Sequence, residues 1–300
     1  MRALAPSLLI AIAVHTAGAQ RIRRDQARVR VDTTFAFDKN GSITVNVPNG
    51  DIVINGSSSN QVHVRGRDDE DVRLDVSSSR VMVQTSSRSD GVELTVPQGV
   101  RVIVTSRSGD VKIMGTQGPV EVHATNGDVE IDDVVGPLDV GSLSGDITVG
   151  NVVGDGDIET TSGDVKLSNV RGSIGASTVS GDIGLRGVTS KDVRAKTTSG
   201  DVTFDGLIDP AGRYEFSSNS GDVRLHVQRD ASAQVTVQTW NGGIESDFPI
   251  TLRAGEHGIG TATSKQFTFV IGGGAARITA QSFSGDIVLS ANGHGATVRP

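Results

Sequence analysis

The sequence contains no cysteine, only eight Phe, one Tyr and one Trp, and no long apolar segment beyond its N-terminus. The absence of cysteine excludes disulfides and thiolate metal sites, so an exported form needs another source of stability. The histidines are scattered singly, without the spacing of a zinc motif. No later segment approaches the roughly 20 apolar residues of a membrane helix, so we expect no transmembrane span. A net charge of -7 disfavours nucleic acid as a partner.

Residues 1–19 have the composition of a secretory signal peptide. Met1-Arg2 is followed by an apolar run from Ala3 to Val14 and by the small residues Ala17-Gly18-Ala19. The alternative, a buried apolar helix, has no helical periodicity elsewhere in the chain to pack on. We therefore expect export to the periplasm, the outer surface or the extracellular space. Cleavage also removes Arg2, which gives a mature charge of -7 - 1 = -8.

Residues 20–30 carry five arginines, and this segment is expected to be a basic flexible arm. Contact of the arm with an anionic envelope polymer or lipid is the alternative interpretation.

A six-residue phrase of the type SGDVKL recurs through the chain. Its aspartate stands at positions 110, 128, 146, 164 and 182, a constant step of 18, and then at 201, 222 and 286. The glycines and aspartates of these turns are Gly109, Asp110, Gly127, Asp128, Gly145, Asp146, Gly163, Asp164, Gly181, Asp182, Gly200, Asp201, Gly221, Asp222, Gly285 and Asp286. Such a period is the signature of a repeat architecture.

Apolar residues form columns in the same register. The first column is Val111, Val129, Ile147, Val165, Ile183, Val202, Val223 and Ile244. A second comprises Val120, Leu138, Ile174, Val193, Tyr214 and Val235, with a gap at Gly156. A corner column follows at Val134, Val152, Val170, Val188 and Leu207. Within each repeat the apolar residues alternate with polar ones, as in strands with one buried face.

One repeat cannot bury its apolar face alone, but a stack of repeats can. The sequence therefore predicts an all-β fold, a parallel β-solenoid of the β-helix or β-roll type, with about 18–21 residues per coil. We expect one solenoid domain over residues 31–300, with regular coils at about 108–245 and an irregular C-terminal cap region at about 246–300. Residues 31–107 are strand-like but less regular, so more open coils are expected there. Aromatic residues gather from Phe204 onward, which indicates a wider C-terminal third.

The repeated Gly-Asp turn has a structural and a chemical interpretation. Glycine supplies the backbone freedom of a bend, and an aspartate can accept hydrogen bonds from free N–H groups in the turn. The alternative is calcium binding, for which Asp155 and Asp157 are the candidate ligands because their spacing comes closest to a calcium-roll turn. One aspartate per coil supplies few of the oxygens that calcium needs, so no cofactor is expected and calcium stays the alternative.

The segment VDTTFAFDKNGSITVNVPNGDIVINGSSSNQVHVRG, followed by serial SGD turns, resembles the bacterial putative-adhesin domains of unknown function. The resemblance covers about residues 31–290 and implies an exported β-solenoid with a role in surface adhesion. It carries no set of catalytic residues.

We therefore expect an exported structural or adhesin-like protein that makes multivalent contacts and is not an enzyme. Its partner would be an envelope polymer, a surface protein or another copy of the chain. A calcium-stabilised envelope binding module is the second hypothesis. A polysaccharide-acting β-helix enzyme is the third, although no paired acids stand beside aromatic platforms.

Overall fold

The computed structural model describes residues 20–21, 31–66, 72–86, 89–249 and 265–292. The predicted signal peptide and most of the predicted arm lie outside the described residues, as does 250–264 of the predicted cap. The described part of the chain is built from strands and turns, and it contains no helix that could span a membrane. Its contacts divide it into two compact units, residues 1–127 and 128–300.

Unit 1 holds the first eleven strands. They are β1 (Gln20–Arg21), β2 (Asp32–Ala36), β3 (Ser42–Val47), β4 (Asp51–Ser57), β5 (Gln61–Gly66), β6 (Arg73–Val76), β7 (Arg80–Gln84), β8 (Gly91–Pro97), β9 (Arg101–Ser108), β10 (Val111–Met114) and β11 (Val120–Asn126).

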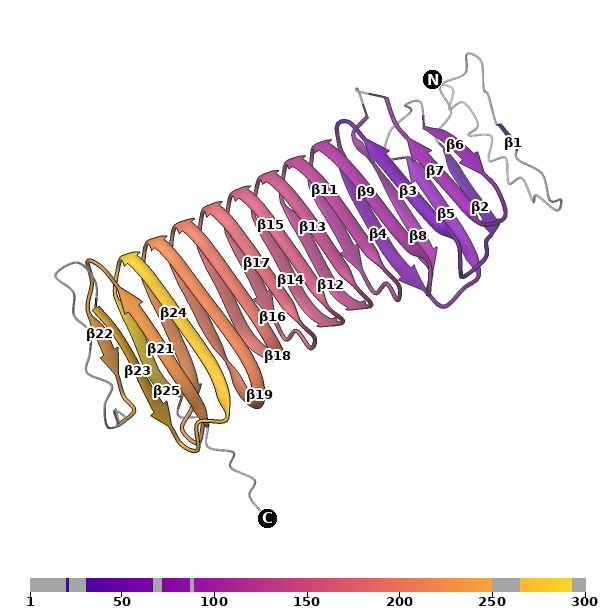
Figure 1. Cartoon of the computed structure of the whole chain (residues 1–300). Coiled ribbons are helices and arrows are strands. Elements are labelled where there is room, and N and C mark those ends of the chain that lie inside the picture. The colour runs from indigo at the N-terminus through magenta and orange to yellow at the C-terminus, as the bar shows by residue number, and fades with distance from the viewer. Residues whose placement is uncertain (1–19, 22–30, 67–71, 87–88, 250–264, 293–300) are drawn as a thin grey trace, which may run out of the picture. The chain divides into compact units, whose positions relative to one another are not determined.

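The coils of unit 1 are not stacked in sequence order. On one side the pairing order is β11–β9–β3–β7–β6, and on the other it is β10–β4–β8–β5–β2 (Figure 1). The coil of β3 and β4 therefore lies between the coil of β9 and β10 and that of β7 and β8. Pairs β5–β8, β2–β5 and β6–β7 are antiparallel. The irregularity expected for residues 31–107 thus takes the form of an inserted coil closed by antiparallel strands.

Unit 2 holds the remaining fourteen strands. They are β12 (Val129–Val135), β13 (Leu138–Ser144), β14 (Ile147–Val153), β15 (Gly156–Ser162), β16 (Val165–Ser168), β17 (Ile174–Ser180), β18 (Ile183–Ser199), β19 (Val202–Ser220), β20 (Val223–Gln228), β21 (Ala233–Thr239), β22 (Ile244–Ser246), β23 (Lys265–Ile271), β24 (Ala276–Ser284) and β25 (Ile287–Asn292).

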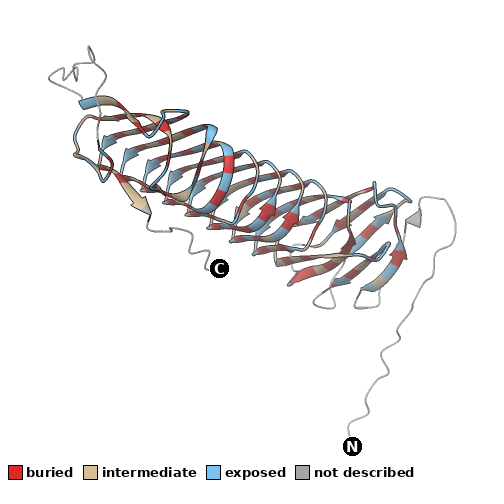
Figure 2. Cartoon of the chain, turned by 90° about the horizontal axis from the view of Figure 1, so that it is seen from below, coloured by how far each residue is buried: buried red, intermediate tan, exposed pale blue. Residues whose placement is uncertain are grey.

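The aliphatic columns predicted from the sequence are present in unit 2. Val129 pairs with Ile147 and Ile147 with Val165, in parallel strands, and all three side chains are at most 1% exposed. Buried and exposed residues alternate along each strand (Figure 2). The coil step is 18 residues here and becomes 19 and then 21 at Val202 and Val223. The predicted all-β class with parallel coils of this length is confirmed.

The last coil of unit 2 is inserted, which the sequence columns did not predict. β24 pairs with β19 on one side and β21 on the other, and β25 pairs with both β20 and β22 (Figure 1). Ile287 therefore separates Val223 from Ile244, and Ile278 separates Tyr214 from Val235. Our placement of Ile244 and Val235 directly above the preceding coil was wrong. β23 then runs antiparallel along the far side of β21.

The corner column ends differently from the prediction. Leu207 is 59% exposed, because it aligns with the exposed Thr189, and Gly206 takes the position next to Val188. A Cβ on Gly206 would lie 2.7 Å from the ring of Phe204, so that ring occupies the space which a larger residue would need. Ile208, 4% exposed, is the buried residue of this corner.

Aromatic residues widen the core where expected, but not all of them are buried. The ring of Phe204 lies 5.9 Å from that of Tyr214 and 5.1 Å from that of Phe216, and all three are at most 1% exposed. The Tyr214 hydroxyl donates to the carbonyl of Ser190 at 2.6 Å. Phe283, in contrast, is 48% exposed.

Candidate functional site

The turn aspartates link neighbouring coils rather than closing their own turns. In unit 2, the Oδ1 of Asp146 accepts the backbone N–H of Asp164 at 2.9 Å, and Asp164 accepts that of Asp182 at 3.0 Å. Equivalent hydrogen bonds join successive turn aspartates from Asp128 through Asp222 to the inserted Asp286. The Oδ1 of Asp286 in turn accepts the N–H of Gly243. In unit 1, Asp51 accepts the N–H of Asp110. We expected each aspartate to cap its own turn, and this is corrected: each aspartate forms a hydrogen bond that links two neighbouring coils.

Two constraints require glycine in the turn at position 163. Gly163 has a φ of 136°, and a Cβ there would lie 2.2 Å from the carbonyl oxygen of Gly145. Any side chain would therefore clash with the turn below as well as strain the backbone. The same close approach to the glycine of the neighbouring coil recurs in unit 2, so these turns stack backbone on backbone; the glycines are Gly181, Gly200, Gly221 and Gly285.

Two cations neutralise part of this carboxylate row. Lys166 lies 3.2 Å from Asp164 and 3.7 Å from Asp146, and Arg224 pairs with both Asp201 and Asp222. The pKa of Asp164 is lowered by the backbone N–H of Asp182 first and by Lys166 second. Partial burial raises the pKa of Asp201, but the hydrogen bonds from Arg224 and Asp222 outweigh it and lower the pKa overall.

A row of buried hydroxyls supports the same turns and was missed at the sequence level. Thr197 donates to the carbonyl of Gly181 at 3.0 Å, Ser218 to that of Gly200 at 2.8 Å, and Ser282 to that of Gly221 at 2.9 Å. The signal was present in the sequence, because a Ser or Thr stands three residues before the glycine of these turns. Each hydroxyl binds the turn of the neighbouring coil, which a pattern within one repeat does not reveal.

Each of the two calcium candidates lies against a residue of the next coil. Asp155 lies at a corner, where its Oδ1 accepts the N–H of Ser173 at 2.8 Å. Asp157 lies two residues on, in β15, with its Oδ1 against Gly175. Within the described ranges, no group of three or more His, Cys, Asp or Glu side chains is placed to hold a metal ion.

The outward face of seven strands in unit 2 forms a regular grid of exposed and half-buried side chains. The strands pair in the order β13–β15–β17–β18–β19–β24–β21, so their outward residues stand in register. In that strand order the middle row of the grid is Gly141, Glu159, Ser177, Lys196, Ser217, Gln281 and Gln238. We call this surface the outer face.

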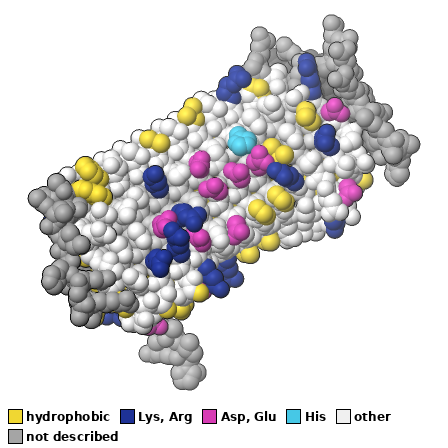
Figure 3. Space-filling view, viewed as in Figure 1, with side chains coloured by type: hydrophobic (Ala, Val, Ile, Leu, Met, Phe, Trp, Pro, Cys, Tyr) yellow, Lys and Arg dark blue, Asp and Glu magenta, His cyan; other side chains and the backbone are white. Residues whose placement is uncertain are grey.

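The outer face has three bands of different chemistry. Asp139, Asp157 and Glu159 form an acidic band on β13 and β15. Arg194, Lys196 and Arg213 form a basic band on β18 and β19, in which Glu215 pairs with both arginines. On β24 and β21 the alternating outward side chains are Thr, Gln and Phe, apart from Arg277 at the start of β24, and Trp240 directly follows β21. Figure 3 shows acidic and basic groups gathered on one face, beside a paler uncharged area.

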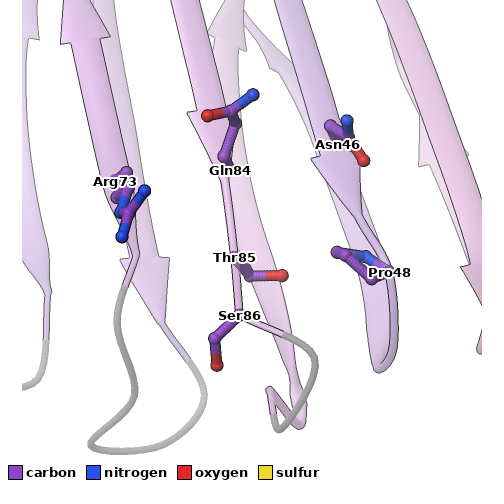
Figure 4. Close-up of a pocket in the computed structure, with 6 residues that line it drawn as sticks. All are labelled: Asn46, Pro48, Arg73, Gln84, Thr85 and Ser86. Atoms are coloured by element: carbon purple, nitrogen blue, oxygen red, sulfur yellow. The ribbon is translucent and has the colours of Figure 1, made fainter.

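A cavity of about 340 Å³ lies in unit 1 and was not anticipated. Figure 4 shows its lining residues, Asn46, Pro48, Arg73, Gln84, Thr85 and Ser86. The Thr85 hydroxyl is buried without a hydrogen-bond partner. One exposed arginine and one unpartnered hydroxyl do not define a ligand, so we assign no role to this cavity.

Solved structures similar to this chain include two bacterial proteins. A putative adhesin from Bacteroides fragilis shares 11% identity and a TM-score of 0.40, over 87% of this chain and 97% of that one. A putative cell adhesion protein from Clostridium sporogenes shares 9% identity and a TM-score of 0.22, over 88% of this chain and 100% of that one.

No curated protein matches the chain. The sequence model of the Toastrack DUF4097 family matches residues 23–290. This match spans most of the sequence and includes both compact units. The chain therefore belongs to the Toastrack DUF4097 family.

Proposed function

We propose that this protein is an exported, adhesin-like binding protein that holds an envelope polymer on the outer face of unit 2 and performs no catalysis. The observation that carries the proposal is the register of that face. Seven adjacent strands place outward side chains in straight rows. Neighbouring strands are about 4.8 Å apart, so the rows offer contacts at regular intervals to a partner that is itself repetitive.

Binding by such a face is multivalent. Each exposed hydroxyl, amide or charge contributes little alone, because it exchanges a bond with water for a bond with the partner. Once one contact has formed, the neighbouring contacts become intramolecular and act at high effective concentration. A flat, stiff sheet adds to this effect because its side chains need little further ordering. A long polymer is therefore expected to bind more tightly than its short fragments.

The turn aspartates are occupied by structural bonds, which supports a non-catalytic role. The Asp164 carboxylate accepts the N–H of Asp182 and pairs with Lys166, and Asp201 is engaged in the same way by Asp222 and Arg224. A carboxylate held in its charged form by such bonds is a poor general acid near neutral pH.

The test is retention of the full chain on isolated envelope fractions, namely peptidoglycan, outer-membrane vesicles and soluble exopolysaccharide. We expect retention on at least one polymer fraction, with an affinity that falls as the polymer is shortened. Lack of retention on all fractions would contradict the proposal. Equal affinity for long and short fragments would contradict its multivalent mechanism.

A further inference from the structure

We propose that the uncharged end of the outer face binds a neutral polysaccharide. This inference rests on the proposed function and names the ligand class for one part of the same face. We call this part the amide–aromatic patch. It comprises Trp240, which directly follows β21, and residues on β24, β21 and β23, namely Thr279, Gln281, Phe283, Thr236, Gln238, Gln266 and Thr268.

The first observation is an aromatic pair on the surface. The ring centroids of Trp240 and Phe283 lie 5.7 Å apart with an interplanar angle of 32°. Phe283 is 48% exposed and Trp240 is half-buried. In Figure 3 hydrophobic side chains gather at the β24 and β21 end of the visible face. The faces of aromatic rings carry negative charge and attract the C–H groups of a pyranose ring, which makes this pair a platform for stacking sugars.

The second observation is two rows of identical polar groups beside the platform. Thr279, Thr236 and Thr268 occupy matched positions on three neighbouring strands, as do Gln281, Gln238 and Gln266. The second set holds even though β23 runs antiparallel, because its sequence Gln-Phe-Thr reverses the Thr-x-Gln order of the other two strands.

The three glutamine amides make no hydrogen bond within the described part of the chain. The hydroxyls of Thr236 and Thr268 lie 3.3 Å apart and contact each other. An amide donates and accepts at once, which suits a sugar hydroxyl that does the same. Successive members of each row are about 4.8 Å apart because they lie on neighbouring strands, and this distance is close to the length of one pyranose unit in an extended chain.

The patch itself contains no charged residue, and the exposed Arg277 lies outside it, at the start of β24, which favours a neutral ligand. The Lys265 ammonium donates to the carbonyl of Gly242 at 2.9 Å. Glu215, on the adjoining strand β19, pairs with Arg194 and Arg213. An acidic polymer would gain no free cation within the patch. A neutral chain can use the amides and the aromatic platform without giving up a favourable charge contact.

The sequence provides its own reporter, because Trp240 is the single tryptophan of the chain. We would titrate the full chain with dextran, soluble β-1,3-glucan, cello-oligosaccharides and galactomannan, and with polygalacturonate as the acidic arm. We expect at least one neutral glycan to shift the Trp240 emission to shorter wavelength and to protect it from acrylamide quenching. Polygalacturonate should change neither signal.

Three variants assign the effect to the patch. Phe283→Ala should raise the Kd for the active glycan by about tenfold or more, equivalent to about 1.4 kcal/mol. Phe283→Tyr keeps the ring and should stay within about threefold of the original Kd. Val153→Ala is the matched control, since Val153 is an exposed valine on β14, outside the outer face, and should leave the Kd unchanged. Thermal melts of all three check that they are folded.

The inference is overturned if no neutral glycan perturbs Trp240, if only polygalacturonate binds, or if Phe283→Ala binds like the original. It is also overturned if the emission shifts with protein concentration alone, because the patch would then bind a second copy. Retention on an envelope fraction separates this failure from that of the proposed function. A chain that is retained equally with and without Phe283→Ala still fits the proposed function.

Discussion

At the residue scale, adjacent positions in the turn have opposite roles. Asp164 faces outward, with its side chain 36% exposed, while Val165 has no exposed surface. The alternation of strand side chains produces this contrast, because consecutive residues point to opposite faces. At two consecutive positions, the repeated sequence therefore places an aspartate that links coils on the outside and a core residue on the inside.

The first prediction compares these two neighbours. Val165→Asp places an unpaired charge between Ile147 and Ile183 and should lower the free energy of unfolding by more than about 4 kcal/mol. Asp164→Ala loses one partly exposed hydrogen bond and one surface ion pair, with Lys166, and should cost about 1 kcal/mol. Denaturant melts of both variants measure the difference. Equal midpoints would contradict the assignment of inside and outside.

The second prediction concerns acid. The pKa values of Asp164 and Asp201 are lowered in the folded chain. An aspartate in the unfolded chain has a pKa of roughly 3.9. As the pH falls below that value, the unfolded chain therefore binds more protons than the folded chain. Stability should therefore be fully present above that pH and fall as the pH drops toward the lower folded values. Melting temperatures from pH 7 to pH 2.5 test this. Asp164→Asn should show a smaller acid loss, and an unchanged loss would argue against a role for Asp164.

At the element scale, the coil is held by rows of equivalent bonds. The buried Thr197 hydroxyl binds the turn of the preceding coil, whereas the next residue, Thr198, is exposed and its hydroxyl forms no hydrogen bond to a described residue. The two threonines thus provide a buried position and a surface control on one strand.

The third prediction uses that pair. Thr197→Val keeps the volume but removes the donor to the Gly181 carbonyl, and should cost about 1–2 kcal/mol of unfolding free energy. Thr198→Val should change it by less than about 0.5 kcal/mol. Urea melts of the two variants give both values, and a larger effect at Thr198 would reverse our assignment of the buried row.

The same scale explains what the sequence could and could not predict. Columns such as Val129–Ile147–Val165 follow from a constant step, because consecutive coils stack directly where nothing intervenes. The position of β24 and β25 in the stack cannot be predicted from the step, because every position in the stack presents the same apolar column and the same glycine turn. A coil of the type SGDIVL fits any of them equally well. The composition of the outer face could not be predicted from the sequence either, because it depends on which strands become neighbours.

In each unit, one coil lies out of sequence order between two other coils. In unit 2 the inserted β24 is covered on both sides, by β19 and β21, while β23 pairs only with β21 among the described strands. In unit 1 the coil of β3 and β4 is inserted in the same way. Each inserted coil pairs with the coil beyond it, β21 and β22 in unit 2 and β7 and β8 in unit 1, and so connects that coil to the rest of its unit.

The fourth prediction is the order of amide exchange in unit 2. Local opening is easiest where backbone bonds are few, so β23 should exchange before β24 even though β24 is nearer the C-terminus. Hydrogen exchange read by mass spectrometry resolves the two segments. A stack in simple sequence order would give the opposite order, with the last strand exchanging first.

The most direct test separates the residues that stabilise the fold from the residues that bind the polymer. The account assigns stability to the turn aspartates and binding to the outer face. Asp164→Ala should therefore lower the melting temperature but keep retention on the envelope polymer. A triple variant of the middle row, Lys196→Ala, Ser217→Ala and Gln281→Ala, should keep the melting temperature and lose retention. Loss of retention in Asp164→Ala at a temperature where it is folded, with full retention by the triple variant, would contradict the account.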